Sequence, residues 1–174
     1  MAAASDSSLI RLDGVRYSYG TVLALDGVDL ALHPGKIHAL VGEHGAGKSS
    51  LAMIIAGELA PRSGQVLFRG VPTQMSRSKA ALRLGVKMIY QTILLNNHFS
   101  VAESIFYSNR IVNRGVWVHR RRMEAAAAEL FERYGIRIKP TASVSSLNIA
   151  ERTVVDIIRS LQTDTSLLIV DEGQ

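Results

Sequence analysis

The sequence predicts an α/β fold that begins with antiparallel β-strands and carries a helical insertion. Three patterns predict this class. Short apolar runs separated by turn-forming pairs fill residues 9–32, which is typical of paired strands. A glycine-rich segment at 42–49 lies between an apolar run and a helical pattern, and residues 92–146 are mainly helical in their apolar spacing. The 174 residues, 47% of them hydrophobic, suffice for one substantial core.

The composition limits the kinds of site the chain can hold. It contains no cysteine, which excludes disulfide bonds, thiolate nucleophiles and cysteine-based metal sites. The formal net charge of +5 suits nucleic acid, anionic lipid headgroups or a phosphate ligand without choosing among them. The densest basic run, His119–Arg122, opens a helical pattern and has no interleaved aromatic platform. We therefore interpret it as a solvated helix start rather than a nucleic-acid surface.

Residues 1–8 predict a loose, disordered terminus. They lack the basic and apolar regions of a signal peptide, and no apolar stretch in the sequence approaches the length that spans a bilayer. From these signals we expect a cytoplasmic protein.

The antiparallel start is predicted from residues 9–32. Its apolar runs are interrupted by pairs that are typical of turns between strands, namely Asp13-Gly14, Asp26-Gly27 and Pro34-Gly35. Tyr17 and Tyr19 fall just before Gly20, where an aromatic ring could stack on a purine or fill the sheet face. Spacing alone favours packing, because aromatic residues in strands usually pack.

The glycine-rich segment fits the spacing of a phosphate-binding loop, Gly-x-x-x-x-Gly-Lys-Ser. The apolar run Ile37–Val41 before it predicts a strand, and residues 51–59 predict a helix after it. Backbone amides and the helix N-terminus would surround a polyphosphate, with Lys48 on the β- and γ-phosphates and the Ser49 hydroxyl on Mg²⁺. The alternative is a glycine-rich turn between a strand and a helix that binds no ligand.

The chain then continues the α/β pattern. A turn at 61–64 leads into a predicted strand at 65–68, and a helix over 78–84 is stopped by Gly85. Residues 86–90 predict a buried strand that ends at Gln91, at the end of the strand where parallel sheets place ligand-contacting groups. A glutamine in a loop is more often only solvated.

The second half predicts helices and a final strand. Ser100 and Glu103 predict a capping box that opens a helix through Phe106, and Gly135 closes a longer amphipathic helix. The apolar positions of that longer helix are Met123, Ala127, Leu130, Phe131 and Tyr134. Asn148 is suited to cap a further helix whose buried face would hold Val154, Val155, Ile158 and Leu161. An apolar strand, Leu167–Val170, then delivers two carboxylates, Asp171 and Glu172, which suit a metal ion and a water.

In order and spacing, these landmarks resemble the nucleotide-binding domain of an ABC transporter ATPase, which has a P-loop NTPase (RecA-like) core. The likeness runs from about Leu9 to Glu172 and is nearest to the sugar-import type (ribose, galactose or arabinose), in which two ATPase domains are fused in one chain. It is carried by Val41–Leu51, Ile54–Gly57, Tyr90-Gln91, Ser100–Phe106 and Val144–Glu151.

The resemblance implies ATP and Mg²⁺ as ligands and assigns the site residue by residue. ATP would be bound by Tyr19, Gly42, Glu43, His44, Gly45, Ala46, Gly47, Lys48, Ser49 and Ser50, with Tyr19 stacking on adenine, which replaces the packing interpretation. Mg²⁺ would be held by Ser49, Gln91 and Asp171, and catalysis would rest on Glu172 as general base with Lys48 and Gln91. A signature segment that acts on a partner's ATP would be Leu147, Asn148, Ile149, Ala150 and Glu151.

The signature segment departs from the family's Leu-Ser-Gly-Gly-Gln pattern. Asn148 stands in place of serine and Glu151 in place of glutamine. Asn148 can still cap a helix and donate an amide hydrogen to phosphate. Glu151 suits the helix dipole but repels an incoming γ-phosphate. We therefore hypothesise a weakened signature half-site.

The end of the sequence departs as well. Gly173-Gln174 stands where the family has proline and threonine, and the five histidines all precede Asp171, so none can occupy the family's switch position. We expect residues 9–174 to form an incomplete nucleotide-binding domain, with a helical subdomain at about 92–146 and the C-terminal part missing. The family fold places a later strand between the strand before the phosphate loop and the strand that ends at Asp171, so the resemblance implies that this chain lacks the middle of its sheet. Unpaired backbone groups would result, and we expect the chain alone to be unstable or aggregating with negligible ATPase activity.

Three functions follow from these patterns. The first is an ATP-binding subunit or domain that energises a sugar importer, peripheral on the cytoplasmic face of the membrane, with a second ATP-binding domain and membrane permease subunits as partners. The second is a nucleotide-binding remnant that does not hydrolyse ATP. The third is a soluble ABC protein that acts on nucleic acid or the ribosome. The helical stretch after Gln91 favours the first, and we expect no direct contact with nucleic acid.

Overall fold

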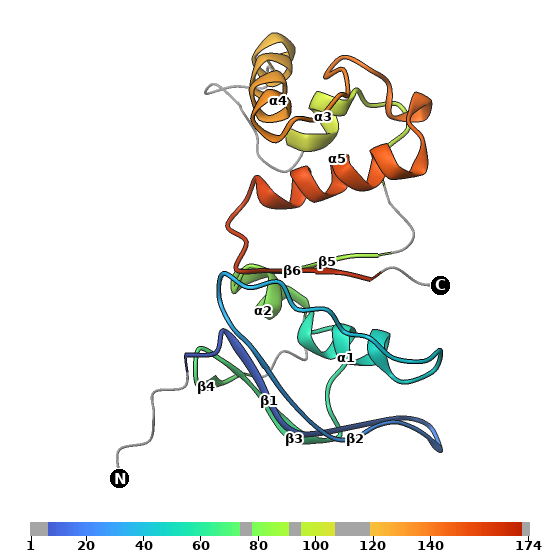
Figure 1. Cartoon of the computed structure of the whole chain (residues 1–174), viewed down its shortest axis with the longest axis vertical. Coiled ribbons are helices and arrows are strands. Elements are labelled where there is room, and N and C mark those ends of the chain that lie inside the picture. Colours follow the sequence, from blue (N-terminus) through green and yellow to red (C-terminus); the bar gives the residue numbers. More distant parts are fainter. Residues whose placement is uncertain (1–6, 74–77, 91–94, 107–118, 172–174) are drawn as a thin grey trace. The chain divides into compact units, whose positions relative to one another are not determined.

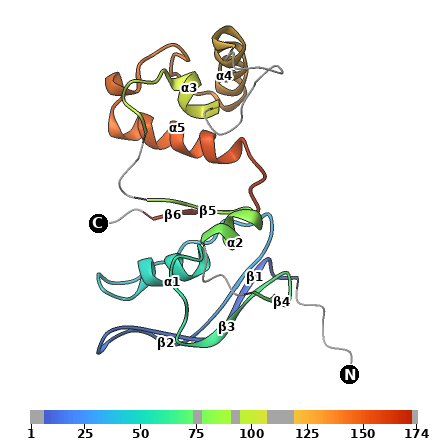
Figure 2. The same ribbon diagram turned by 180° about the vertical axis from the view of Figure 1, so that it is seen from behind.

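A computed structural model describes residues 7–73, 78–90, 95–106 and 119–171 of the chain. The chain divides into two compact units, Met1–Met88 with Ser166–Gln174 and Ile89–Thr165 (Figures 1 and 2). Each unit has its own hydrophobic core. The predicted mixed α/β class, with an antiparallel sheet at the start, is confirmed. No helix within the described ranges is long and apolar enough to cross a bilayer.

The first unit is built on a four-stranded antiparallel sheet. Its strands are β1 (Ile10–Tyr19), β2 (Val22–Leu32), β3 (Ser63–Phe68) and β4 (Val71–Pro72), in the order β2-β1-β3-β4. β1 and β2 form a hairpin in which Tyr19 pairs with Val22, so the connection is Gly20-Thr21. Gly20 has φ 58°, which a two-residue hairpin loop requires and glycine adopts without steric cost.

The predicted turns at Asp13-Gly14 and Asp26-Gly27 are wrong, because both pairs lie inside continuous strands as β-bulges. The β1–β2 register shifts at each of them, between Leu12 and Val15 and between Val15 and Tyr17. A glycine with positive φ fits a bulge as well as it fits a turn, so the sequence pattern does not separate the two.

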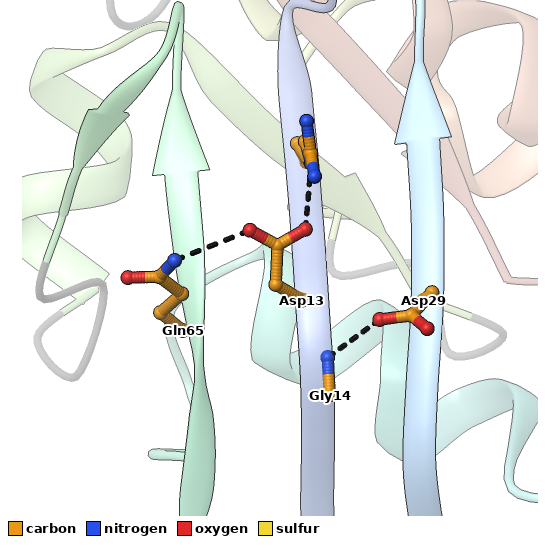
Figure 3. Close-up of polar contacts among 5 residues, drawn as sticks. Asp13, Gly14, Asp29 and Gln65 are labelled. Atoms are coloured by element: carbon orange, nitrogen blue, oxygen red, sulfur yellow. Dashed lines mark hydrogen bonds and ion pairs between the residues drawn. The ribbon is translucent and has the colours of Figure 1, made fainter.

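Side chains compensate for the ladder bonds that the first bulge disrupts. The Gly14 N–H donates to Asp29 Oδ1 at 2.6 Å, and Asp13 Oδ2 accepts from Gln65 Nε2 at 3.2 Å across the sheet (Figure 3). Gly64 opposes the bulge so closely that a Cβ at its position would lie 2.4 Å from the Gly14 carbonyl oxygen. The bulge is therefore fixed by hydrogen bonds and by a position that only glycine fits.

A helix covers the sheet of the first unit. This helix is α1 (Lys48–Ile55), which lies against the sheet of β1, β2 and β3 (Figures 1 and 2). Its Leu51, Ile54 and Ile55 share one core with residues of β1 and β2. The unit also contains α2 (Ser78–Arg83) and a two-stranded sheet of β5 (Val86–Ile89) and β6 (Leu167–Val170). The Gly85 carbonyl accepts from the backbone N–H groups of Ser166 and Leu167, which brings the two ends of this unit together.

The predicted strand Ile37–Val41 is wrong for the structure described. The segment has no regular secondary structure, Ile37 is fully exposed and Val41 is 89% exposed. A strand is stabilised by a neighbour that accepts and donates ladder hydrogen bonds. None of the ladders formed by the described residues includes this segment, so its apolar composition alone does not make it a strand.

The second unit is helical. α3 (Val101–Phe106) contacts both α4 (Arg120–Tyr134) and α5 (Ile149–Leu161), and a 3-10 turn (Val144–Ser146) precedes α5. The predicted capping box of α3 is confirmed, since Ser100 N donates to Glu103 Oε2 at 2.7 Å and Glu103 N donates to Ser100 Oγ at 3.2 Å. The αL residue Gly135 closes α4 as predicted.

The buried faces of α4 and α5 are largely those that the sequence predicts. Met123, Ala127 and Phe131 of α4 and Val155 and Ile158 of α5 are buried in the core of this unit. Two predicted core positions are wrong, because Tyr134 and Leu161 are exposed. Each is the last residue of its helix, where a preceding turn covers only one side of the side chain.

Candidate functional site

The predicted phosphate loop leads directly into α1. The helix begins at Lys48, and its N-cap Gly47 has φ 83°, a left-handed conformation that favours glycine. Within the loop, Ala46 N donates to Glu43 O at 3.2 Å, and Leu51 N makes the first helical bond to Gly47 O at 2.9 Å. The amides that precede Leu51 in the first turn have no acceptor inside a helix. They are the groups that a bound anion would satisfy.

Gly47 is also the point where the loop meets the antiparallel sheet. A Cβ at this position would lie 2.4 Å from the Ala24 carbonyl oxygen and 2.9 Å from Leu25 Cδ2. The hairpin has a third bulge, between the pairs Tyr17–Leu25 and Ser18–Leu23, and Ala24 of β2 is its extra residue. By contrast, a Cβ at Gly45 would meet open space. The last glycine of the loop is therefore required by both its backbone conformation and its close contact with β2.

Lys48 places its ammonium group on the loop itself. Its Nζ donates to the carbonyl oxygens of Gly42 at 2.7 Å and of Glu43 at 2.6 Å. These two bonds hold a positive charge against the first residues of the loop. A phosphate in the loop would therefore meet both uncapped amides and a positioned cation, which is the chemistry that phosphate recognition needs.

Ser49 and Asp171 are brought together although 122 residues separate them. Asp171 directly follows β6, and its Oδ1 lies 3.4 Å from Ser49 Oγ, which donates to it. Oxygen ligands on one Mg²⁺ ion lie about 3 Å apart, and such ions are usually held by one or two carboxylates together with phosphate oxygens and waters. The pair therefore suits a Mg²⁺ ion. Among the described residues there is no cluster of three or more His, Asp or Glu that could hold a metal.

Tyr19 lies at the tip of the β1–β2 hairpin, beside the start of α1. Its side chain is 49% exposed, and its Oη accepts a long hydrogen bond of 3.4 Å from Ser50 Oγ. The ring also meets Tyr17 edge-to-face, with the ring centroids 4.9 Å apart and an interplanar angle of 83°. Spacing identified both tyrosines but missed their mutual contact, although two residues apart on a strand share one face.

The predicted signature segment forms the start of α5 in the second unit. Asn148 is the N-cap, as predicted. Its Oδ1 accepts from Glu151 N at 2.9 Å, and Glu151 Oε2 accepts from Asn148 N at 2.9 Å. Ile149 and Ala150 between them are exposed, whereas Leu147 is buried and its carbonyl accepts from Arg152 Nε at 3.1 Å. The carboxylate of Glu151 therefore occupies the helix N-terminus and is held there by hydrogen bonds.

Two of the predicted catalytic residues, Gln91 and Glu172, lie outside the described residues. Their roles stay predictions. Among the other predicted positions, Gly42, Glu43, His44, Gly45 and Ala46 form the exposed loop, and Ser50 is buried in the first turn of α1.

Comparisons with known proteins agree with this arrangement. The ABC transporter family model matches residues 25–174. A putative ribose/galactose/methyl galactoside import ATP-binding protein of Burkholderia cenocepacia is 42% identical over 168 residues, covering 97% of this chain and 32% of that protein. A ribose import ATP-binding protein of Rubrobacter xylanophilus is 42% identical over 164 residues, covering 94% of this chain and 33% of that protein. The chain thus spans about a third of the length of the curated relatives it matches.

Solved structures share the fold. CbiO1 of Clostridium perfringens, part of the ABC transporter complex CbiONQ, superposes with a TM-score of 0.77 at 24% identity, covering 95% of this chain and 65% of that one. A nucleotide-free ATP-binding cassette from an ABC transporter superposes with a TM-score of 0.76 at 20% identity, covering 94% and 68%.

Proposed function

The chain belongs to the ABC transporter family, and on that premise we propose that it is an ATP-binding subunit or domain that energises the import of a sugar. The observation that carries the proposal is the joint geometry of the loop, in which Lys48 Nζ lies on the loop carbonyls and Ser49 lies 3.4 Å from Asp171. The sugar specificity is supported by the ribose and galactose import proteins to which the chain is similar.

In the proposed mechanism, the described residues position the nucleotide. The uncapped amides of the loop and of the first turn of α1 donate to the β- and γ-phosphates, and Lys48 Nζ exchanges its two carbonyl acceptors for phosphate oxygens. Ser49 and Asp171 would hold Mg²⁺, which would neutralise charge on the phosphate oxygens. Tyr19 stacks on the base. Glu172 would act as the general base, and Gln91 would contact the metal or the attacking water.

The signature half-site is proposed to be weak. In the start of α5, the Glu151 carboxylate accepts the Asn148 N–H, so the negative charge already lies where the helix dipole favours an anion. A γ-phosphate presented by a second ATP-binding domain would meet that charge at close range, where repulsion between anions opposes binding. This observation supports the second candidate function, a nucleotide-binding module that hydrolyses ATP slowly or not at all.

The permease contact is proposed to lie on the second unit. A hollow of about 580 Å³ there is lined by apolar side chains and by charged and polar ones, namely Phe106, Ala126, Leu130, Glu129, Glu132, Arg133 and Gln162. Cytoplasmic segments of membrane proteins carry an excess of Lys and Arg. The two glutamates outweigh the one arginine of the lining, so an amphipathic helix with a basic side would match the hollow in both hydrophobicity and charge. In this arrangement the protein is peripheral on the cytoplasmic face of the membrane.

The permease proposal is tested by charge reversal. We expect Glu129→Lys with Glu132→Lys to reduce the amount of permease that co-purifies with the protein, while Glu58→Lys, at an exposed site in the other unit, leaves it unchanged. Equal co-purification with the double variant and the wild type would contradict this location.

Nucleotide binding is tested by calorimetry on the full-length protein. We expect Lys48→Ala to weaken Mg-ATP binding about 10- to 100-fold, because a charge-assisted hydrogen bond is lost. Lys36→Ala, at an exposed position outside the loop, is the matched control. Measuring phosphate release from ATP distinguishes the importer ATPase from the non-hydrolysing module. Measuring the uptake of labelled ribose or galactose by vesicles that contain the protein and its permease tests the transported substrate. Unchanged binding by Lys48→Ala would contradict the proposal.

A further inference from the structure

We infer that Tyr17 is a positioning residue for the nucleotide base, because it fixes the ring of Tyr19 from the side. The inference rests on the proposed function, since it requires that Tyr19 stack on adenine. Tyr17 itself would touch neither the base nor the phosphates.

The hairpin geometry makes the contact between the two rings. Residues two apart on a strand project from the same face, so Tyr17 and Tyr19 of β1 are neighbours on that face. Their centroids are 4.9 Å apart at an interplanar angle of 83°. In this arrangement the edge of one ring meets the face of the other. Whichever ring supplies the edge, at least one face of Tyr19 stays available for a stacked base.

A second contact ties the same ring to the phosphate-binding helix. Ser50 is buried in the first turn of α1, two residues after Lys48, and its hydroxyl donates to Tyr19 Oη at 3.4 Å. Ala24 on the paired strand contacts Gly47 at the start of the same helix. The hairpin tip and the phosphate loop are therefore joined twice, which sets the distance from the stacking ring to the phosphates.

This fixation matters because Tyr19 is half exposed. An exposed aromatic side chain samples several rotamers, and immobilising it on binding costs affinity. Tyr17 is partly buried against the core of the first unit, so it holds one orientation of its own and transmits it to Tyr19. The ring is preorganised before the base arrives. Loss of the Tyr17 contact should therefore weaken binding of a nucleotide but not of a bare polyphosphate.

The test compares Mg-ATP with Mg-tripolyphosphate, which has the phosphates without the base. Binding of each ligand is measured by calorimetry on the full-length protein. For Tyr17→Leu, which keeps an apolar side chain, we expect ATP affinity to fall about threefold to tenfold, the loss expected for one edge-to-face ring pair. Tripolyphosphate affinity should not change. Tyr17→Phe keeps the ring and should bind ATP with the affinity of the wild type. Tyr134→Leu makes the same substitution at an exposed tyrosine of α4 and should change neither affinity.

Each outcome bears on the inference. Equal ATP affinity for Tyr17→Leu and the wild type overturns it, and so does an equal loss for both ligands, which would mean a role in folding only. Tyr17→Ile, a strand-favouring variant, provides the same comparison if the leucine variant does not fold. If Tyr19→Leu binds ATP normally, base stacking fails and the inference fails with it, while the phosphate site stands. If the wild type binds neither ligand, the proposed function fails first.

Discussion

Two helix starts in this protein solve the same problem in opposite ways. The first amides of any helix lack an acceptor inside the helix. At α1, Gly47 offers no side chain as a cap, and the first turn, residues 48–51, contains no acidic residue. At α5, Asn148 and Glu151 cap each other's backbone N–H groups. One helix leaves its amides for an outside anion, and the other satisfies them with its own carboxylate.

From this difference we infer that a helix N-terminus can bind phosphate only when its own sequence leaves the amides available. The family resemblance implies that both segments act on nucleotide phosphates, yet their local chemistry differs. The contrast can be tested at either end.

The largest effect is expected where the open helix start meets the sheet. Gly47→Ala forces a Cβ to within 2.4 Å of the Ala24 carbonyl at φ 83°. We expect the free energy of unfolding to fall by roughly 1–3 kcal/mol and Mg-ATP binding to be lost with it. Gly45→Ala also has a positive φ but meets open space, so it should cost about 1 kcal/mol. Urea denaturation of the two variants measures the difference, and equal losses would contradict the role of the Ala24 contact.

A second variant changes the capped start without removing its cap. Glu151→Gln keeps a side chain that can accept the Asn148 N–H but removes the negative charge. In a complex reconstituted with a second ATP-binding domain, we expect ATP turnover to rise about fivefold or more, because the proposed repulsion of the γ-phosphate would be relieved. The unfolding free energy should stay within about 0.5 kcal/mol of the wild type. An unchanged or lower turnover would count against the weakened half-site.

The cap itself should contribute a smaller amount. Asn148→Ala removes the acceptor for Glu151 N and should lower the free energy of unfolding by about 1 kcal/mol, whereas Asn148→Ser should cost only a few tenths. Thermal or urea unfolding of both variants measures this. Equal destabilisation by alanine and serine would show that the hydrogen bond contributes little.

The smallest effect concerns a third helix start, α3, and its dependence on pH. The backbone N–H of Ser100 donates to the Glu103 carboxylate and is the main cause that lowers its pKa; the Ser100 hydroxyl and Arg120 lower it further, while burial opposes them. Because the folded pKa lies below the unfolded value of about 4.3, the bond stabilises the fold above that pH. The stabilisation is lost as the pH falls through the folded pKa.

Glu103→Gln should therefore flatten the acid side of the stability profile. Denaturation midpoints of the variant and the wild type should differ at neutral pH and converge below the folded pKa. A difference that stays constant over the whole acid range would contradict a contribution from the ionised carboxylate.

Local signals predicted the helix starts well, and non-local ones were missed. The pairs Ser100 with Glu103 and Asn148 with Glu151 lie three residues apart, so a capping box can be read directly from the sequence. The sequence predicts turns at Gly14 and Gly27, where the structure has bulges, because a positive φ suits both. The strand predicted at Ile37–Val41 depends on a neighbour, which local composition cannot reveal.

In the candidate site, too, local features could be predicted from the sequence and non-local contacts could not. The loop of residues 42–49 follows from spacing, but the approach of Asp171 to Ser49 was implied only by the family resemblance. The close contact of Gly47 with Ala24 depends on a bulge on another strand, and no spacing rule along the chain indicates it. The Tyr17–Tyr19 contact could have been inferred from the two-residue period of a strand.

The exposed segment Ile37–Val41 also sets how the protein behaves at high concentration. A short, mostly apolar segment that carries no formal charge and takes part in no ladder among the described residues can add to another copy of itself. Association through it needs two molecules to meet, so its rate rises with the square of the protein concentration. Light scattering of dilute and concentrated samples would reveal that dependence, and a charged residue such as Leu40→Lys would suppress it.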